Sequence, residues 1–262
     1  MKRCYSFLLA VVFSATLSFA QDAVQPTSVI QDLLDVAEPG SVVSVPAGTY
    51  QGALTIPDTI VVQGAGDGQT ILDGQDALNV VSFGKESVLI GFTVRNGQSL
   101  INSKGNFIGV FECTLENFRR NGVFFETGAG VVANNVIRGD GKAVGILSYG
   151  ANPLVINNLI ENNAVGFQWF LNLIPSVVEN LFRNNDVAIR GPEQGTIVLE
   201  RNLFDNNREI GYRGVLPESN EVRSVAPNEF TLRRGVGFDA YQRLMDTTYE
   251  AAVKDHPIII YD

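Results

Sequence analysis

The sequence predicts an all-β fold, a parallel β-helix whose chain winds into coils of about 22 residues with three short strands each. Seven charged positions, spaced 21 to 23 residues apart, alternate in sign without a break: Asp73, Arg95, Glu116, Arg138, Glu161, Arg183 and Asp205. A fixed period in this range is typical of a solenoid whose repeats stack on their neighbours. Because stacked strands lie about 4.8 Å apart, each charge is expected to meet opposite charges in the adjacent coils.

The positions on either side of this charge ladder indicate how each coil is built. The residue before each charge is large and apolar, as an inward-facing row requires: Leu72, Val94, Leu115, Ile137, Ile160, Phe182 and Phe204. The residue after each charge is Gly or Asn, the types that most readily adopt a left-handed backbone: Gly74, Asn96, Asn117, Gly139, Asn162, Asn184 and Asn206. The three rows predict core, solvent and a tight corner.

Two further short strands complete each coil. β-branched or aromatic segments follow the corner at 123–126, 144–147, 165–168, 187–190 and 210–213. Third strands near 131–133, 154–156, 176–178 and 197–199 lead into Asn135, Asn158, Asn180 and Asn202. This pattern is too short for a leucine-rich repeat or a propeller blade, and the chain has no Gly-Gly-x-Gly-x-Asp calcium repeat.

The two ends of the solenoid are expected to be capped. Apolar residues at helical spacing over 28–37, ended by Pro39 and Gly40, predict a short N-terminal helix that closes the open end of the core. Periodicity stops after Val225, and 238–253 forms a helical pattern. We expect residues 21–226 to form the β-helix with its N-terminal cap. Residues 227–262 form either a C-terminal cap or a segment that contacts a partner protein of the cell envelope.

Residues 1–20 have the features of a secretory signal peptide. Lys2 and Arg3 precede an apolar run over 7–13, and small residues surround the expected cleavage site after Ala20. The apolar run is too short for a membrane span. The sequence therefore predicts an exported protein, periplasmic, at the cell surface or extracellular, with no membrane span in the mature chain.

Composition excludes several classes of site. The chain has 19 basic and 28 acidic residues, a net charge of −9, and lacks the basic patches that nucleic-acid binding needs. Its one histidine, His256, lies near the C-terminus, too isolated for a zinc site or a Ser-His-Asp triad. Only Cys113 remains after signal cleavage. We expect neither a metal nor another cofactor.

The N-terminal coils resemble a known family. The segment 28–74, with Pro46-Ala47-Gly48-Thr49-Tyr50 and Ile71-Leu72-Asp73-Gly74, is similar to the opening of right-handed parallel β-helix proteins of the pectin-lyase-like superfamily. The coil over 157–167 resembles the repeat type of carbohydrate-binding proteins and sugar hydrolases. The resemblance covers about 28–225. It implies a right-handed helix and relatives that include secreted polysaccharide lyases, hydrolases, epimerases and adhesins.

A shelf of small residues on the second strand is one candidate site. Its positions are expected to point outward: Phe124, Gly145, Gly166, Ala188 and Gly211. Aromatic faces bind apolar sugar surfaces, while amide and guanidinium groups bond hydroxyls or a carboxylate. The candidate ligand-binding residues are Glu126, Tyr149, Gln168, Trp169, Arg190 and Arg213. The alternative is that this shelf receives the helical pattern at 238–253, and this alternative is favoured.

A second outward row precedes the next corner, and its members are Glu112, Asn134, Asn157, Glu179 and Arg201. A lyase needs a base with charge neutralisation, and a glycosidase needs two carboxylates about 5–9.5 Å apart. The candidate catalytic residues are Glu112, Glu179 and Arg201. A neutralised surface pair is the simpler interpretation of Glu179 and Arg201, because the row shows neither a clustered acidic calcium site nor paired aspartates.

Three hypotheses about function follow from the sequence. The favoured hypothesis is an exported β-helix protein that binds carbohydrate or polysaccharide along an outward strand face. The alternatives are a polysaccharide lyase or glycoside hydrolase, and a structural or adhesive component of the cell envelope.

Overall fold

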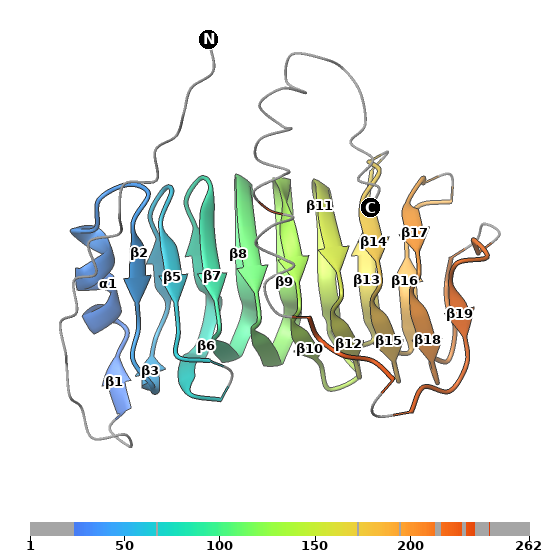
Figure 1. Cartoon of the computed structure of the whole chain (residues 1–262), viewed down its shortest axis with the longest axis horizontal. Coiled ribbons are helices and arrows are strands. Elements are labelled where there is room, and N and C mark those ends of the chain that lie inside the picture. Colours follow the sequence, from blue (N-terminus) through green and yellow to red (C-terminus); the bar gives the residue numbers. More distant parts are fainter. Residues whose placement is uncertain are drawn as a thin grey trace, which may run out of the picture.

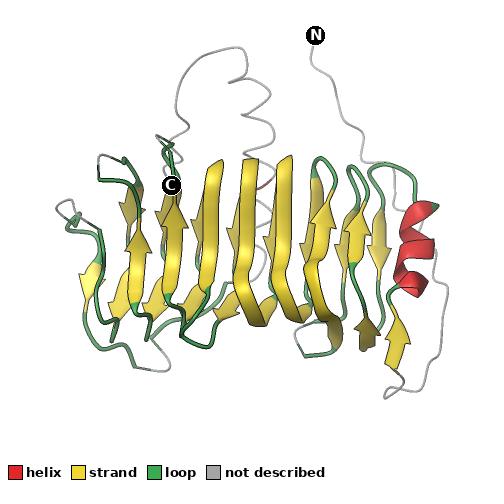
Figure 2. Cartoon of the chain, turned by 180° about the vertical axis from the view of Figure 1, so that it is seen from behind, coloured by secondary structure: helices red, strands yellow, loops and turns green. Residues whose placement is uncertain are grey.

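The computed structural model describes residues 24–66, 68–171, 173–193, 195–212, 216–226, 229–233 and 241. These form one elongated β-solenoid of parallel strands (Figure 1). The same stack is seen from behind in Figure 2, with one short helix at its end. The expected signal peptide lies outside the described residues, as does most of the predicted C-terminal cap. No helix in the described ranges is long and apolar enough to span a membrane.

The strands form one 19-stranded parallel sheet that wraps around the core in three faces, and each face is named here for its place in the coil. The ladder face carries β1 (Val24–Pro26), β3 (Gly48–Gln51), β10 (Val136–Arg138), β12 (Leu159–Glu161), β15 (Leu181–Arg183), β18 (Leu203–Asp205) and β19 (Glu221–Val222). The middle face carries β4 (Leu54–Ile56), β13 (Val165–Trp169) and β16 (Val187–Arg190). The return face carries β2 (Val42–Ser44), β5 (Val61–Gln63), β7 (Ser87–Ile90), β14 (Ser176–Val178) and β17 (Val198–Glu200).

Four long strands bend from one face to the next. They are β6 (Thr70–Phe83), β8 (Thr93–Phe111), β9 (Thr114–Ala133) and β11 (Val144–Ile156). Each pairs in parallel with the equivalent part of the adjacent coil. The predicted three-strand coil is therefore confirmed.

The charge ladder lies in register along the ladder face. Each of its members is paired with the next one, from Asp73 opposite Arg95 to Arg183 opposite Asp205. Ion pairs join Arg95 Nε to Asp73 Oδ2 at 3.2 Å and Arg183 Nε to Asp205 Oδ2 at 2.9 Å. Burial raises the pKa of Asp73, but hydrogen bonds from Asn96, Gln75 and Arg95 outweigh it and bring the pKa below its ordinary value. This carboxylate therefore stays ionised.

The apolar row beside the ladder fills the core. Its seven members, from Leu72 to Phe204, are at most 2% exposed, and the rings of Phe182 and Phe204 stack 5.4 Å apart. Burial of such a side chain contributes about 1.5–3 kcal/mol, whereas an exposed ion pair contributes about 0.2–1 kcal/mol. The apolar rows hence supply most of the stability, and the charges favour one register.

The first corner is only partly as predicted. The five asparagines of the row, Asn96, Asn117, Asn162, Asn184 and Asn206, have φ between 51° and 59°. Gly74 and Gly139 are not left-handed, so that part of the prediction is wrong. At these two positions glycine provides space. A Cβ on Gly74 would lie 2.2 Å from Val80 Cγ2, and one on Gly139 would lie 2.6 Å from Asn163 Oδ1.

A ladder of buried asparagines runs through the corner before the ladder face. Its members are Asn135, Asn158, Asn180, Asn202 and Asn220. Each Nδ2 before the last donates to the Oδ1 of the next asparagine at 2.9–3.0 Å. The same amide groups donate to backbone carbonyls, as Asn180 does to Val155. Every coil is thereby bonded to its neighbours inside the molecule.

The N-terminal helix α1 (Ser28–Asp35) caps the solenoid, as predicted. Its Ile30 and Leu34 are 1% exposed and belong to the main core. The Gln31 side chain exchanges two hydrogen bonds with the backbone of Thr55 on β4. These contacts hold the helix over the open end of the apolar interior.

We predict that Arg138→Glu lowers the free energy of unfolding by about 1 kcal/mol, because it places three carboxylates in a row with Glu116 and Glu161. The melting temperature should fall by about 2–4 °C at low salt and by less at high salt. Thermal unfolding at two salt concentrations measures this. Arg120→Glu, the same change at an exposed position off the ladder, is the control. A salt-independent melting temperature equal to that of the unmodified protein would contradict the prediction.

Candidate functional site

The small residues of the predicted shelf face the interior, so the shelf is not an outward surface. Ala188 belongs to the main core. A Cβ on Gly166 would lie 2.8 Å from Phe182 Cδ1, and one on Gly145 would lie 3.2 Å from Ile160 Cγ2. Small residues are needed at these positions because large side chains pack directly against the backbone there. The outer row of the middle face consists of Phe124, a shelf position that does point outward as predicted, together with Leu147, Gln168 and Arg190, which lie side by side in register.

Trp169 is also misplaced by the sequence prediction. It is 2% exposed, and its ring stacks on Phe167 with centroids 6.1 Å apart. Gly191 lies so close that an added Cβ would be 2.2 Å from the indole ring. The ring of Phe167 and the backbone at Gly191 and Gly195 surround the indole and bury it. It therefore cannot contact a surface ligand in this conformation.

The exposed aromatic groups lie at the end of the middle face. Tyr149 is 51% exposed and Phe170 is 40% exposed, with ring centroids 5.8 Å apart and an interplanar angle of 50°. Glu126, also predicted to bind ligand, is half-buried and lies 3.9 Å from Lys104 Nζ. Arg213 lies outside the described residues. Of the six predicted ligand-binding residues, Tyr149, Gln168, Arg190 and Glu126 are accessible.

The predicted catalytic row forms a second tight corner. Glu112, Asn134, Asn157, Glu179 and Arg201 all have φ between 50° and 59°, a conformation that is uncommon for glutamate and arginine. Glu112 and Glu179 are three coils apart in this row, about 14 Å at the usual strand spacing. That separation exceeds the range of about 5–9.5 Å that glycoside hydrolysis requires. The two glutamates do not form a catalytic pair.

Glu179 is neutralised from two sides. Its Oε1 accepts a hydrogen bond from Arg201 Nε at 2.9 Å, and its Oε2 contacts the Arg233 guanidinium. Arg233 also donates its backbone N–H to Asn157 Oδ1 at 2.7 Å, while Asn157 Nδ2 donates to the Thr231 carbonyl. The segment 229–233 is thereby fastened across this corner. This arrangement matches the alternative of a neutralised surface pair.

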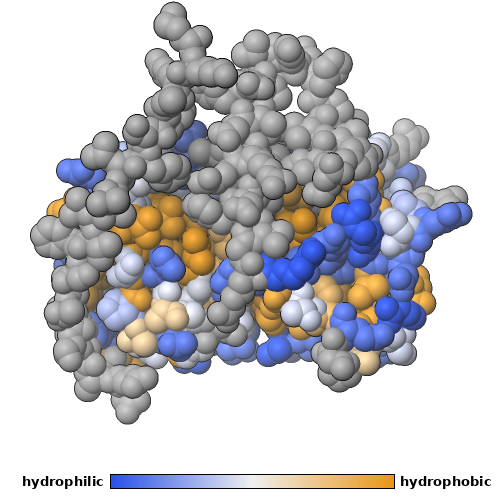
Figure 3. Space-filling model, viewed as in Figure 1, coloured by the Kyte–Doolittle hydropathy of each residue, from blue (hydrophilic) through white to orange (hydrophobic). Residues whose placement is uncertain are grey.

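The return face carries an apolar surface on its outer side. Val88, Phe111, Val131 and Ala133 form a small cluster with Tyr241, separate from the main core. Figure 3, which views this face, shows its hydrophobic residues gathered in patches.

Tyr241 packs against this surface. Its ring lies 5.0 Å from that of Phe107 and 5.9 Å from that of Phe111, and it is 4% exposed. Burial raises the pKa of its hydroxyl, and the charge of Glu86 raises it further. The sequence hypothesis placed this segment against the shelf of the middle face, and for Tyr241 that is wrong because the small residues of that shelf point inward.

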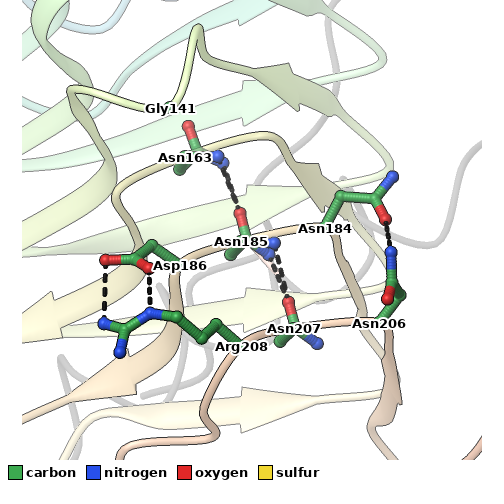
Figure 4. Close-up of a pocket in the computed structure, with 8 residues that line it drawn as sticks. All are labelled: Gly141, Asn163, Asn184, Asn185, Asp186, Asn206, Asn207 and Arg208. Carbon is green, nitrogen blue, oxygen red and sulfur yellow. Dashed lines mark hydrogen bonds and ion pairs between the residues drawn. The ribbon is translucent and has the colours of Figure 1, made fainter.

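A polar groove lies at the first corner, between the ladder face and the middle face. It has a volume of about 530 Å³ and is lined by Gly141, Asn163, Asn184, Asn185, Asp186, Asn206, Asn207 and Arg208. Figure 4 shows these residues, which come from four adjacent coils. Asn163, Asn185 and Asn207 form a second asparagine ladder at its floor, with Nδ2 to Oδ1 distances of 2.9 Å. Asn206 Nδ2 donates to Asn184 Oδ1 at 2.6 Å on the outer side.

An ion pair closes one side of the groove. Both oxygens of Asp186 accept hydrogen bonds from the Arg208 guanidinium, one of them from Nη2 at 3.1 Å (Figure 4). The Arg208 hydrogen bond holds the pKa of Asp186 below its ordinary value, and the charges of Arg208 and Arg190 lower it further. Asp186 is therefore a carboxylate at neutral pH, and its charge is compensated.

A second groove lies on the same corner, nearer the N-terminus. It has a volume of about 370 Å³ and is lined by Asp76, Asn96, Gly97, Asn117, Phe118, Arg119 and Asp140. Arg119 Nε lies 3.1 Å from Asp76 Oδ1. Both grooves thus combine left-handed asparagines with a paired aspartate and arginine. The sequence predicted these asparagines only as corners.

None of the described residues forms a group of three or more His, Cys, Asp or Glu side chains that could hold a metal ion. What the corner grooves offer is hydrogen-bond donors and acceptors, chiefly amides.

We predict that Tyr241→Ala exposes the rings of Phe107 and Phe111 and leaves the solenoid folded, because Tyr241 packs outside the main core. Binding of a hydrophobic dye should rise several-fold while the far-ultraviolet circular dichroism stays unchanged. Tyr149→Ala removes an exposed tyrosine and should not change dye binding. Equal dye binding by the Tyr241→Ala variant and the unmodified protein would show that this contact does not cover the face.

Comparison with curated protein sequences found no match. Among solved structures, the chain is similar to an alginate lyase from Paenibacillus sp. str. FPU-7, with 11% identity, a TM-score of 0.45 and coverage of 78% of this chain and 98% of that chain. It is also similar to the mannuronan C-5 epimerase AlgE4 A-module of Azotobacter vinelandii, with 14% identity, a TM-score of 0.33 and coverage of 80% and 96%. The AlgE6 A-module from the same organism has 15% identity, a TM-score of 0.28 and coverage of 80% and 98%.

A family model described as a right handed beta helix region matches residues 56–248, most of the chain. This match confirms the resemblance to right-handed parallel β-helix proteins, and the chain belongs to the right-handed β-helix family.

Proposed function

We propose that this protein binds a polysaccharide or other glycan along its outer surface, at the corner between the ladder face and the middle face. The observation that carries the proposal is the groove of Figure 4, where amides from three coils surround an aspartate and an arginine. Sugars present many hydroxyl groups, and amide, carboxylate and guanidinium groups are suitable partners for them.

One buried acceptor at the groove supports a hydroxyl-bearing ligand. The Oδ1 of Asn163 is buried and has no hydrogen-bond partner among the described residues, although its Nδ2 donates to Asn185. A buried acceptor left unsatisfied costs about 1–3 kcal/mol. Asn163 lines the groove beside Gly141, so a shift of its buried side chain toward the groove would let a ligand hydroxyl donate to this oxygen and recover part of that cost.

The far end of the middle face offers a different type of contact. Tyr149 and Phe170 present their rings there, and aromatic rings pack against the apolar faces of sugars. Gln168 and Arg190 lie in the outer row of the same face. We propose that a long chain uses the corner groove and extends across the middle face toward these rings.

The proposal is binding without turnover. A lyase or hydrolase that uses Glu112, Glu179 and Arg201 remains the alternative, but Glu179 is paired with Arg201 and Arg233. Export and a structural role in the cell envelope are further proposals that follow from residues 1–20 and from the C-terminal segment. Release of unsaturated or reducing sugar from a glycan panel would favour the enzymatic alternative.

We predict that Asn206→Gly weakens glycan binding about tenfold or more, because it removes an amide of the groove. Glycine tolerates the left-handed backbone at this position, where φ is 51°. A glycan array followed by titration calorimetry on the best ligand measures the effect.

Asn162→Gly is the matched control. Asn162 has the same backbone conformation, with φ of 57°, one coil before Asn184, and does not line the groove. Its variant should bind as the unmodified protein does. The proposal fails if no glycan binds, or if Asn206→Gly binds as tightly as the control.

A further inference from the structure

The charges of the first groove cancel within a small area. Asp186 is bound by Arg208 through both carboxylate oxygens. Two more charges act on this pair, because Arg190 lowers the pKa of Asp186 and Glu209 raises that of Arg208. The four side chains comprise two cations and two anions. The groove therefore presents polar groups with no net charge.

The second groove has the same balance. Arg119 pairs with Asp76, and Lys142 Nζ lies 3.7 Å from Asp140 Oδ2. Asp76, Arg119 and Asp140 line this groove. Two cations and two anions again meet at the corner, so the pattern occurs twice on one edge of the solenoid.

We propose that these grooves bind uncharged polysaccharides and that, in the first groove, Asp186 determines this specificity by occupying Arg208. The inference rests on the proposed glycan binding and names its substrate class. A free guanidinium binds a carboxylate in a two-pronged arrangement. Here Asp186 already fills that arrangement. A uronate chain would have to displace Asp186 or bring its own carboxylate next to it, which costs free energy through like-charge repulsion.

Neutral hydroxyls avoid this competition. They bond to the exposed amides of Asn184 and Asn206 without displacing an ion pair. The net charge of the chain, −9, also disfavours the approach of polyanions.

The test compares neutral and anionic oligosaccharides of equal length. Gluco- and manno-oligosaccharides are the neutral probes, and oligogalacturonate and oligomannuronate are the anionic probes. Titration at low salt should show binding of a neutral probe and at least tenfold weaker binding of both uronates. Asp186→Asn frees Arg208, and it should strengthen uronate binding by about tenfold or more, so that the ratio of uronate affinity to neutral affinity rises.

Glu221→Gln is the charge-matched control. It changes the net charge by the same amount, but Arg223 stays paired with Glu229 away from the groove, so uronate binding should remain weak. Uronate binding by the unmodified protein as tight as neutral binding would overturn the inference and leave glycan binding intact. Equal uronate affinity of Asp186→Asn and Glu221→Gln would also overturn it. The absence of binding to every probe would overturn both proposals.

Discussion

The buried side chains of Asn135, Asn158, Asn180, Asn202 and Asn220 have to satisfy their hydrogen-bonding groups away from water, and the coils supply the partners. From Asn135 to Asn202, each amide donates to the next asparagine and to the backbone. These bonds form only when equivalent positions lie directly over one another. A slip of one residue would leave several buried groups without partners, at about 1–3 kcal/mol each. This buried asparagine ladder therefore sets the register of the coils, and the apolar rows then stabilise that register.

The register of the coils also determines which side chains lie next to one another on the outer surface. Because the coils stack in line, the residues after five of the seven charged positions form a corner of left-handed asparagines, and the residues beyond them gather Asp186 and Arg208 into one groove. The same alignment places Glu112 and Glu179 three coils apart, too far for joint chemistry. The same sequence repeat thus produces both the stacked coils and the groove lined by amides.

The sequence predicted most of the fold because period and residue type act together. The apolar row from Leu72 to Phe204, the charge ladder and the capping helix all follow from spacing. It did not predict the asparagine ladders, although Asn135, Asn158 and Asn180 recur at a spacing of 22 to 23 residues. A regular spacing of asparagine alone does not distinguish a corner from a buried amide.

The candidate site was less predictable because it depends on where each strand bends. Strict alternation placed Gly145, Gly166 and Ala188 outside, but the middle face packs two successive positions, Ala188 and Ile189, into the core. Trp169 is buried as well, because it points to the same side of its strand as Phe167. Contacts between distant segments, such as Arg233 with Glu179 and Tyr241 with Phe107, leave no periodic signal at all.

Equilibrium unfolding of Asn180→Leu tests the account most directly. Asn180 is 0% exposed, accepts bonds from Asn158 and donates to Val155, Val178 and Asn202. Leucine has a similar volume but makes none of these bonds, so the free energy of unfolding should fall by about 3 kcal/mol or more. Asn152→Leu, the same change at an exposed position, should cost far less. A cost below about 1 kcal/mol at Asn180 would contradict the claim that the buried asparagine ladder sets the register.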